Sequence, residues 1–321
     1  MKINKSVLVK QIAVLCAVAA IFALLNTVVY FNFTKPCLPD ESEGRSARTI
    51  DVWRYLPFDE NSFIVKDKAN VEFTGELPVL DGAEGLYPLF SAFVNAVYPE
   101  SAVSFDGEQF SSDSKLQMNN TLRSYKAVVD GTADIVFNAA PSEAQMAYAE
   151  EKGVELEFVP IGKEAFVFIV NGNNPVDGLT TEQIRGAFSG KYTNWKQFGG
   201  KNIPINPLKR LEGSGSQSTL VRFMGGTEMK SNPLGFLGSP LGFSFRFYAE
   251  DVVRHGNVKL LAVDGVYPEN ENISDGSYPL VSEFYAVYDK NNPNSAVKEM
   301  IDFILSGQGQ SIVERTGFSR I

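Results

Sequence analysis

The sequence has very few residues that could bind a metal. It contains one histidine and two cysteines among 321 residues, and no Cys-x-x-Cys spacing occurs. A structural zinc site needs about four cysteine or histidine ligands at short spacings. Cys16 lies inside an apolar run and Cys37 just beyond it, which disfavours an intrachain disulfide. We therefore expect no metal site and no cofactor.

Basic residues are also scarce. The chain has 29 lysines and arginines against 38 acidic residues, which gives a formal net charge of -9. A protein that binds nucleic acid needs a basic surface that displaces counterions from phosphates. We therefore expect no nucleic-acid partner, and any anionic ligand must be held by local donors against the overall charge.

Signatures of catalysis are missing as well. The run Gly-Ser-Gly-Ser at 213–216 is out of register with the Gly-x-Ser-x-Gly turn of serine hydrolases. A serine–histidine–acid system would have to use His255, which precedes Gly256 as a polar helix end would. We expect the protein not to be an enzyme, and a hydrolase that uses His255 is kept as the weakest hypothesis.

The N-terminus carries a long apolar segment. Residues 12–31 contain no charge, and three lysines precede them. Twenty helical residues span roughly 30 Å, enough to cross a bilayer. Because the acidic residues follow the segment and the lysines precede it, we expect a signal anchor over 1–32, at the cell membrane, with the body outside the cytoplasm. A cleaved signal peptide is the alternative. Residues 33–76 are interpreted as a tether and lead-in.

From residue 77 onward, strand and helix patterns alternate. Short apolar runs at 77–80, 133–139, 156–162 and 165–171 predict strands. A Ser-x-x-Gln start and a terminal glycine predict a helix over 142–153, and Thr180 or Thr181 is expected to cap the next. The alternating Phe243, Phe245 and Phe247 predict one face of a strand. The pattern indicates an α/β fold with mainly parallel sheets.

Three predicted helix starts share one chemistry. They lie at 81–88, 119–125 and 210–218, and each places small or hydroxyl residues at the beginning of a helix. Unpaired backbone N–H groups and the positive end of the helix dipole bind anions there. Arg210 adds a guanidinium four residues before Ser214. Ordinary helix capping is the alternative interpretation.

The stretch from Pro160 to Ser218 also carries a family resemblance. Its succession of "PIG", "NPV", "FSGKYTNW" and "RLEGSGS", followed near the C-terminus by "FILSGQGQSIVERTGF", resembles the periplasmic phosphate-binding proteins of ABC transporters. The resemblance implies a two-lobe periplasmic-binding-protein fold of type II with hinge crossovers near 159–166 and 260–268. Lobe 1 would comprise 77–164 and 265–321, and lobe 2 would comprise 165–264. It also implies a monomer whose partners are phosphate and ABC permease subunits.

The family's ligand site matches this sequence in part. Arg210, Ser214, Gly215 and Ser216 match the arginine and the hydroxyl-glycine turn, with serine where threonine is usual. Thr121 matches a ligand-binding serine at the second helix start. These five residues are the ones that the resemblance assigns to the ligand most directly.

Two positions depart from the family pattern. Glu84 and Gly85 stand in the first loop, where relatives often have threonine or serine. Ala139, with Asn138 beside it, stands where phosphate binders have an aspartate that accepts the ligand's proton. A site without that carboxylate admits a fully ionised oxyanion, and Glu84 could act as acceptor or repel an anion. Phosphate is the expected ligand, and a surface sensor or interaction module without transport is the alternative function.

Overall fold

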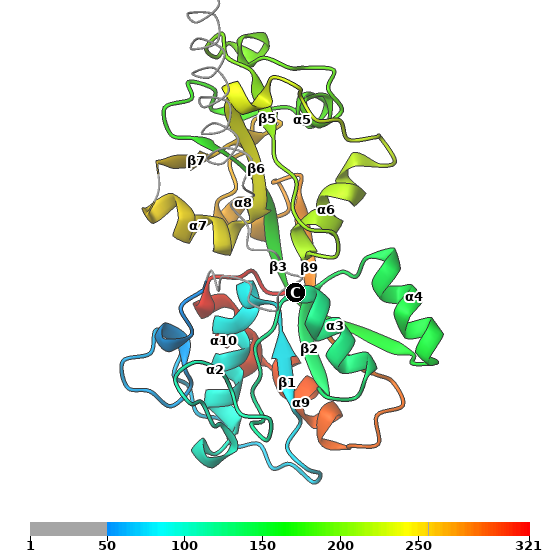
Figure 1. The fold of residues 1–321 in the computed structure, drawn as a ribbon. Coiled ribbons are helices and arrows are strands. Elements are labelled where there is room, and N and C mark those ends of the chain that lie inside the picture. The colour runs from blue at the N-terminus through cyan, green and yellow to red at the C-terminus, as the bar shows by residue number, and fades with distance from the viewer. Residues whose placement is uncertain (1–49, 256) are drawn as a thin grey trace, which may run out of the picture. The chain divides into compact units, whose positions relative to one another are not determined.

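The computed structural model describes residues 50–255 and 257–321 (Figure 1). The expected signal anchor and the tether up to residue 49 lie outside the described residues. Within the described part, no helix is long and apolar enough to cross a membrane. Residues 50–321 form one compact unit.

Buried side chains form two main hydrophobic cores, one in each lobe. We define lobe 1 as residues 50–164 and 282–321, and lobe 2 as residues 165–281, because the core residues divide at these positions. In lobe 1, α2 (Tyr87–Val97), α9 (Ala296–Leu305) and α10 (Gly307–Thr316) pack around the first core. In lobe 2, α5 (Thr181–Phe188) and α6 (Gly215–Met224) contribute to the second.

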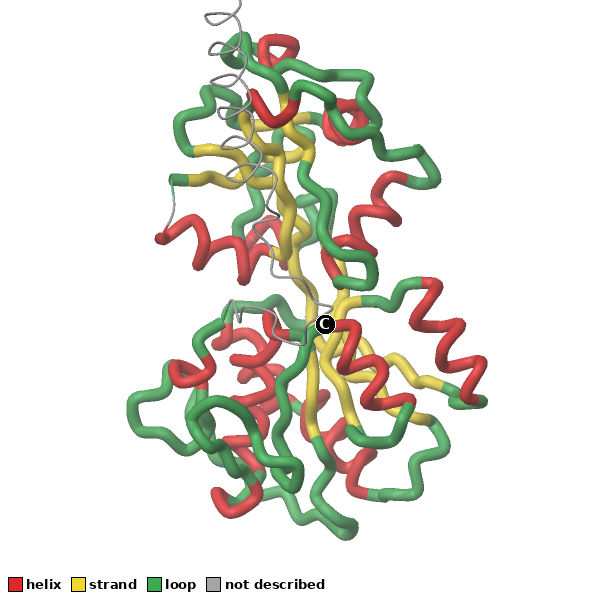
Figure 2. Tube along the Cα trace, viewed as in Figure 1, coloured by secondary structure: helices red, strands yellow, loops and turns green. Residues whose placement is uncertain are grey.

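One long strand joins the lobes. β3 (Leu156–Asn171) pairs first with β9 (Val281–Asp289) and then with β6 (Ser239–Phe245) and β7 (Val258–Leu260), always antiparallel. Two strands had been predicted here, and they form one strand with an irregularity between Pro160 and Gly162. Figure 2 shows strand running from one lobe into the other at the position where Figure 1 labels β3.

The alternation of strands and helices predicts mainly parallel sheets, but most of the strand pairing is antiparallel. β2 (Ile135–Ala139) pairs parallel with β1 (Leu80–Gly82) but antiparallel with β9. β5 (Ile205–Pro207) pairs parallel with β6, and β4 (Gly178–Leu179) with β8 (Ala262–Val263). Much of the strand pairing is antiparallel because β3 and β9 run in opposite directions through the junction of the lobes. Each of these two strands is paired along most of its length.

The second crossover lies later than predicted. Ile273 and Tyr278 are buried in the core of lobe 2, and α8 (Asn270–Ser274) belongs to the same lobe. The chain returns at Leu280, whose carbonyl accepts the backbone N–H of Phe166 at 2.8 Å. Lobe 2 therefore extends beyond the predicted boundary at 264, since the apolar residues after it pack on β3.

Helix starts and ends follow the sequence signals closely. α4 (Glu143–Lys152) begins with a capping box between Ser142 and Gln145 and ends at Gly153 in the left-handed region, as predicted. Thr180 caps α5. The predicted strand through Phe247 is shorter: β6 ends at Phe245, and α7 (Arg246–His255) follows. Phe247 stacks on Phe318 of lobe 1 with ring centroids 4.8 Å apart.

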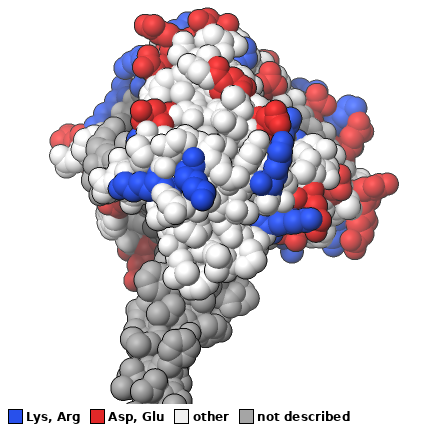
Figure 3. Space-filling model, turned by 90° about the horizontal axis from the view of Figure 1, so that it is seen from above, with Lys and Arg blue, Asp and Glu red and all other residues white. Residues whose placement is uncertain are grey.

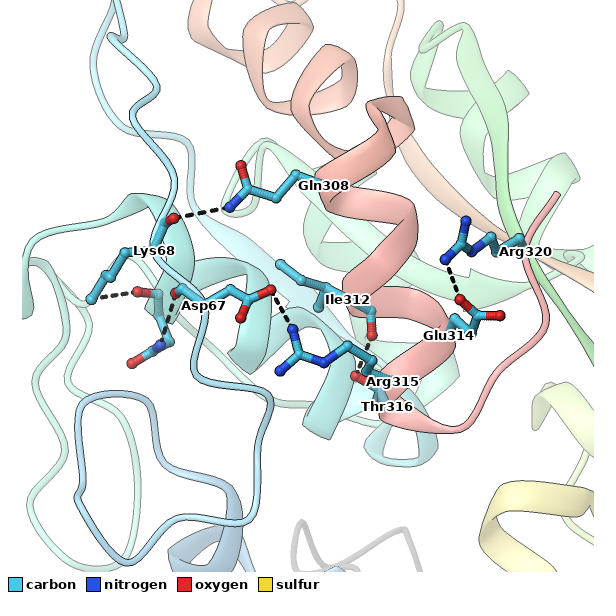
Figure 4. Close-up of polar contacts among 9 residues, drawn as sticks. Asp67, Lys68, Gln308, Ile312, Glu314, Arg315, Thr316 and Arg320 are labelled. Atoms are coloured by element: carbon cyan, nitrogen blue, oxygen red, sulfur yellow. Dashed lines mark hydrogen bonds and ion pairs between the residues drawn. The ribbon is translucent and has the colours of Figure 1, made fainter.

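The lead-in packs against lobe 1. η2 (Val52–Tyr55) buries Val52 in the first core. The Asp67 carboxylate lies 2.6 Å from the Arg315 guanidinium of α10, and the Gln308 side chain donates to the Lys68 carbonyl at 2.9 Å (Figure 4). Residues 50–68, which lie within the segment interpreted as tether and lead-in, are thus packed on the folded body.

Candidate functional site

The second and third predicted helix starts meet between the lobes. α3 (Thr121–Val129) begins in lobe 1, and α6 begins in lobe 2 at Gly215. A Cβ added to Gly215 would lie 3.4 Å from the Thr121 Oγ1 and 3.3 Å from the Ala139 Cβ. The adjoining ends of the two helices are visible in Figure 1. Glycine at 215 therefore permits a close approach of the two backbones.

The first helix start lies beside the second. The Ala83 N–H donates to the Phe137 carbonyl at 2.9 Å, and the Asn119 N–H donates to the Gly82 carbonyl at 3.2 Å. Glu84 begins the short helix η3 (Glu84–Leu86), which leads directly into α2, and its side chain is half-buried. A Cβ added to Gly85 would meet nothing within 4 Å. The loops before α2 and α3 are thus joined in lobe 1.

The third turn is held by a side chain that the sequence analysis did not single out. Gln217 accepts the Arg210 backbone N–H at 2.8 Å through its Oε1, and its own N–H donates to the Ser214 Oγ at 3.3 Å. Ser214 is thus the N-cap of α6, and Ser216 follows in its first turn with 6% of its surface exposed. Gln217 thus ties the loop at Arg210, which follows β5, to the start of α6.

Arg210 is half-buried at this turn. Its guanidinium carbon lies 6.0 Å from the ring centroid of Tyr248, within the range of a cation–π contact. The aromatic face orients the side chain without neutralising its charge. Arg210, Ser214, Gly215 and Ser216 are therefore brought together by one turn, as expected from their spacing.

Asn138 does not lie where a ligand-contacting residue would. Its side chain is fully buried and its Nδ2 donates to the Ser124 Oγ of α3 at 3.0 Å. Side chains alternate between the faces of a strand, so Asn138 and Ala139 point in opposite directions. Ala139 faces Gly215, whereas Asn138 supports the second helix start from behind.

Asp81 is a buried carboxylate that the sequence analysis missed. It is 1% exposed, and its two oxygens accept the Gly82 N–H and the Asn119 Nδ2, both at 2.7 Å. Burial raises the pKa of Asp81 to about 6, although both hydrogen bonds favour the charged form. The Asp-Gly pair at a strand end was the available signal. Asp81 links the first two loops of the site.

Polar contacts also join the lobes beside the helix starts. Gln145 of α4 donates to the Gly213 carbonyl at 3.2 Å. Arg222 of α6 donates to the Pro141 carbonyl at 3.2 Å. These hydrogen bonds hold the two lobes in contact beside the helix starts.

Comparison with known families agrees with this architecture. The sequence model of the PBP superfamily domain matches residues 114–308. The chain belongs to the PBP superfamily. This confirms the resemblance that the sequence motifs had indicated.

Curated relatives of this PBP superfamily member include two phosphate-binding proteins named PstS. The protein from Bacillus subtilis is 25% identical over 263 residues, which cover 78% of this chain and 82% of the relative. The protein from Borreliella burgdorferi is 26% identical over 225 residues, which cover 62% and 80%. The match thus spans most of each relative.

Solved structures share the fold. A putative phosphate ABC transporter substrate-binding protein from Clostridium perfringens, with bound phosphate, superposes with a TM-score of 0.56 at 24% identity. The match covers 75% of this chain and 98% of that one. An ABC-type phosphate transport receptor from Vibrio cholerae gives a TM-score of 0.53 at 19% identity, with coverages of 75% and 99%. These likenesses establish a mixed α/β periplasmic-binding-protein-like fold.

The site of this PBP superfamily member offers donors for an anion. Backbone N–H groups at the start of a helix are free to bind an anion, and Arg210 supplies a fork of charged donors beside them. No group of three His, Cys, Asp or Glu residues in the described part of the chain could hold a metal. On the face seen in Figure 3, charges of both signs are interspersed with uncharged surface, so an anion would be recognised locally.

Proposed function

We propose that the chain is an extracytoplasmic solute-binding protein that captures a small oxyanion, phosphate first, between its lobes for an ABC transporter. The observation that carries this proposal is the meeting of the α3 and α6 starts at Thr121 and Gly215, next to Arg210. Helix N-termini and a guanidinium are the groups that proteins use to bind phosphate. The PstS relatives support the same ligand class.

The composition of the site bears on the protonation state of the ligand. Ala139 offers no acceptor at the wall that faces Gly215. A carboxylate there would accept a hydrogen bond from the hydroxyl of hydrogen phosphate and so select a protonated ligand. Without it, this selection is lost. The proposed ligand is therefore an oxyanion that is bound mainly through its acceptor oxygens.

Membrane attachment is a further part of the proposal. The uncharged segment at 12–31 would serve as a signal anchor and hold the monomeric body outside the cytoplasm. Closure of the lobes on the oxyanion would form the surface to which the permease subunits bind. Cell fractionation of the full chain tests the anchor: recovery of the full-length protein in the soluble fraction would contradict it.

Calorimetric titration of the full chain in detergent with inorganic phosphate tests the ligand. We expect Arg210→Ala to weaken binding by about 10-fold to 100-fold, because a charge-assisted hydrogen bond contributes roughly 1.5–3 kcal/mol. Lys209→Ala is the matched control, since it removes the adjacent cation, which is exposed. Titrations at about pH 6 and about pH 8 compare the two ionisation states of phosphate.

A folded protein that gives no heat with phosphate would contradict the phosphate proposal. Ala139 favours one second candidate, a surface sensor or interaction module on the same fold, because it removes the expected proton acceptor. The same titration repeated with arsenate and sulfate separates the two. Binding of either anion would keep the transport proposal with another ligand, and no binding would favour the sensor.

A further inference from the structure

A cavity lies between the lobes, further along α6 than Gly215. It has a volume of about 400 Å³, and its walls come from lobe 1, from the junction strands β3 and β9, and from α6 of lobe 2. The lining residues are Ala139, Ala140, Lys163, Thr219, Arg222, Val281, Ser282, Glu283 and Tyr285. Ala139 contacts both regions, but none of the eight residues predicted for the ligand site lines this cavity.

The position on α6 separates the two sites. Thr219 and Arg222 follow Gly215 along the same helix. At 1.5 Å per residue they lie roughly 6 and 10 Å further along the helix axis than Gly215. A ligand in the cavity would therefore contact the middle and the end of α6 rather than its N–H groups.

Lys163 supplies an unpaired cation to the cavity. It lies directly opposite Glu283 in the β3–β9 register, where neighbouring side chains share one face of the sheet. Glu283 instead accepts the Tyr285 hydroxyl at 3.0 Å, and Lys163 forms no ion pair with a carboxylate among the side chains that the structure describes. Its ammonium group remains available to a ligand.

Arg222 supplies a second cation from lobe 2. Its Nη1 donates to the Pro141 carbonyl at 3.2 Å, and its Nη2 donates to the Thr219 Oγ1 at 3.1 Å. These bonds fix the guanidinium at the wall without neutralising it. Partial burial lowers the pKa of Arg222, and a bound anion would offset that cost.

The charges define the class of ligand. Lys163 and Arg222 outnumber the one carboxylate of the lining, Glu283, so the cavity is positive overall. We infer that it is a second ligand site, which takes a small molecule through a phosphate or carboxylate group held between Lys163 of lobe 1 and Arg222 of lobe 2. The Glu283 carboxylate can accept a hydrogen bond from a hydroxyl or ammonium group of the same molecule. Because the walls belong to both lobes, the occupant binds the closed form and favours closure.

Two measurements on the full chain in detergent test this inference, with inorganic phosphate and arsenate as probes. In the Arg210→Ala background, where binding at the α3 and α6 starts is weakened, phosphate titration should still show a second binding step, and Lys163→Met should weaken that step by about 10-fold or more. Lys290→Met is the matched control, since Lys290 pairs with Glu155 outside the cavity at 2.5 Å. Arsenate soaked into crystals should give an anomalous peak between Lys163 and Arg222.

The outcomes are distinct from those of the ligand proposal above. If every phosphate-binding step has the same affinity in Arg210→Ala as in Lys209→Ala, the site at α3 and α6 is contradicted; the cavity is judged by the Lys163 variants and by the arsenate peak. No arsenate peak between Lys163 and Arg222, or residual phosphate binding that is equal in Lys163→Met and Lys290→Met, would overturn the second site. Equal melting temperatures of the two lysine variants show that both are folded.

Discussion

The helix start in lobe 2 and the first helix start in lobe 1 serve one site with different chemistry. In lobe 2, Arg210 provides a cation and the turn capped by Ser214 provides hydrogen-bond donors. Gly215 of the same turn lies against Ala139 and Thr121 of lobe 1. In lobe 1, Asp81 and Glu84 place carboxyl groups at the first loop. The two sides thus have opposite formal charges.

This difference explains how an acidic chain can hold an anion. The net charge of -9 opposes the approach of an anion, but the field within the cleft depends on the nearest groups. The lobe 2 side attracts the ligand, whereas the acids on the lobe 1 side limit affinity and make it sensitive to pH. Substitutions on each side should therefore act in opposite directions.

The largest effect is expected at Gly215. Gly215→Val should lower phosphate affinity by about 100-fold, because even the first added carbon would lie 3.3 Å from the Ala139 Cβ and the lobes would close less completely. Titration calorimetry measures the loss. Gly307→Val is the control, since a Cβ at Gly307 meets nothing within 4 Å at the start of α10. Equal affinity in both variants would show that the lobes do not need to approach at Gly215.

A smaller effect is expected at Asp81, and it concerns stability. Its pKa of about 6 exceeds the ordinary value of 3.8, so the folded state favours the protonated form. The stabilisation is complete below about pH 4 and is lost as the pH rises through 6. From pH 4 to 7, the wild type should lose about 1–3 kcal/mol of unfolding free energy that Asp81→Asn does not lose. Urea unfolding across this range measures it, and parallel pH profiles of the two proteins would contradict the assignment.

Local signals predicted the helix starts well because they depend on neighbours in sequence. Ser142 and Gln145 form the predicted capping box, and Thr180 caps α5. The turn at Arg210 and Ser214 could also be predicted from the sequence, since the residues that form it lie within eight positions of one another. These features need no information about the other lobe.

Features that depend on distant partners were not predictable. The orientation of Asn138 is decided by Ser124, and the burial of Asp81 by Asn119, each on a separate segment. The second crossover was placed too early because Tyr278 donates its hydroxyl to the Phe166 carbonyl, a contact that no local pattern reveals. The expected lobe boundary followed a turn in the sequence, whereas the observed one follows packing on β3.

The smallest effect is expected at Glu84, on the acidic side of the comparison. Glu84→Gln should raise phosphate affinity by about 2-fold to 5-fold, because a half-buried charge near the cleft contributes up to roughly 1 kcal/mol. The gain should shrink in high salt, which screens exposed charges. Glu100→Gln is the control, since Glu100 lies beyond the far end of α2 and is exposed. If Glu84→Gln weakened binding, Glu84 would be an acceptor for a protonated ligand, and the acid missing at Ala139 would have been replaced from the first loop.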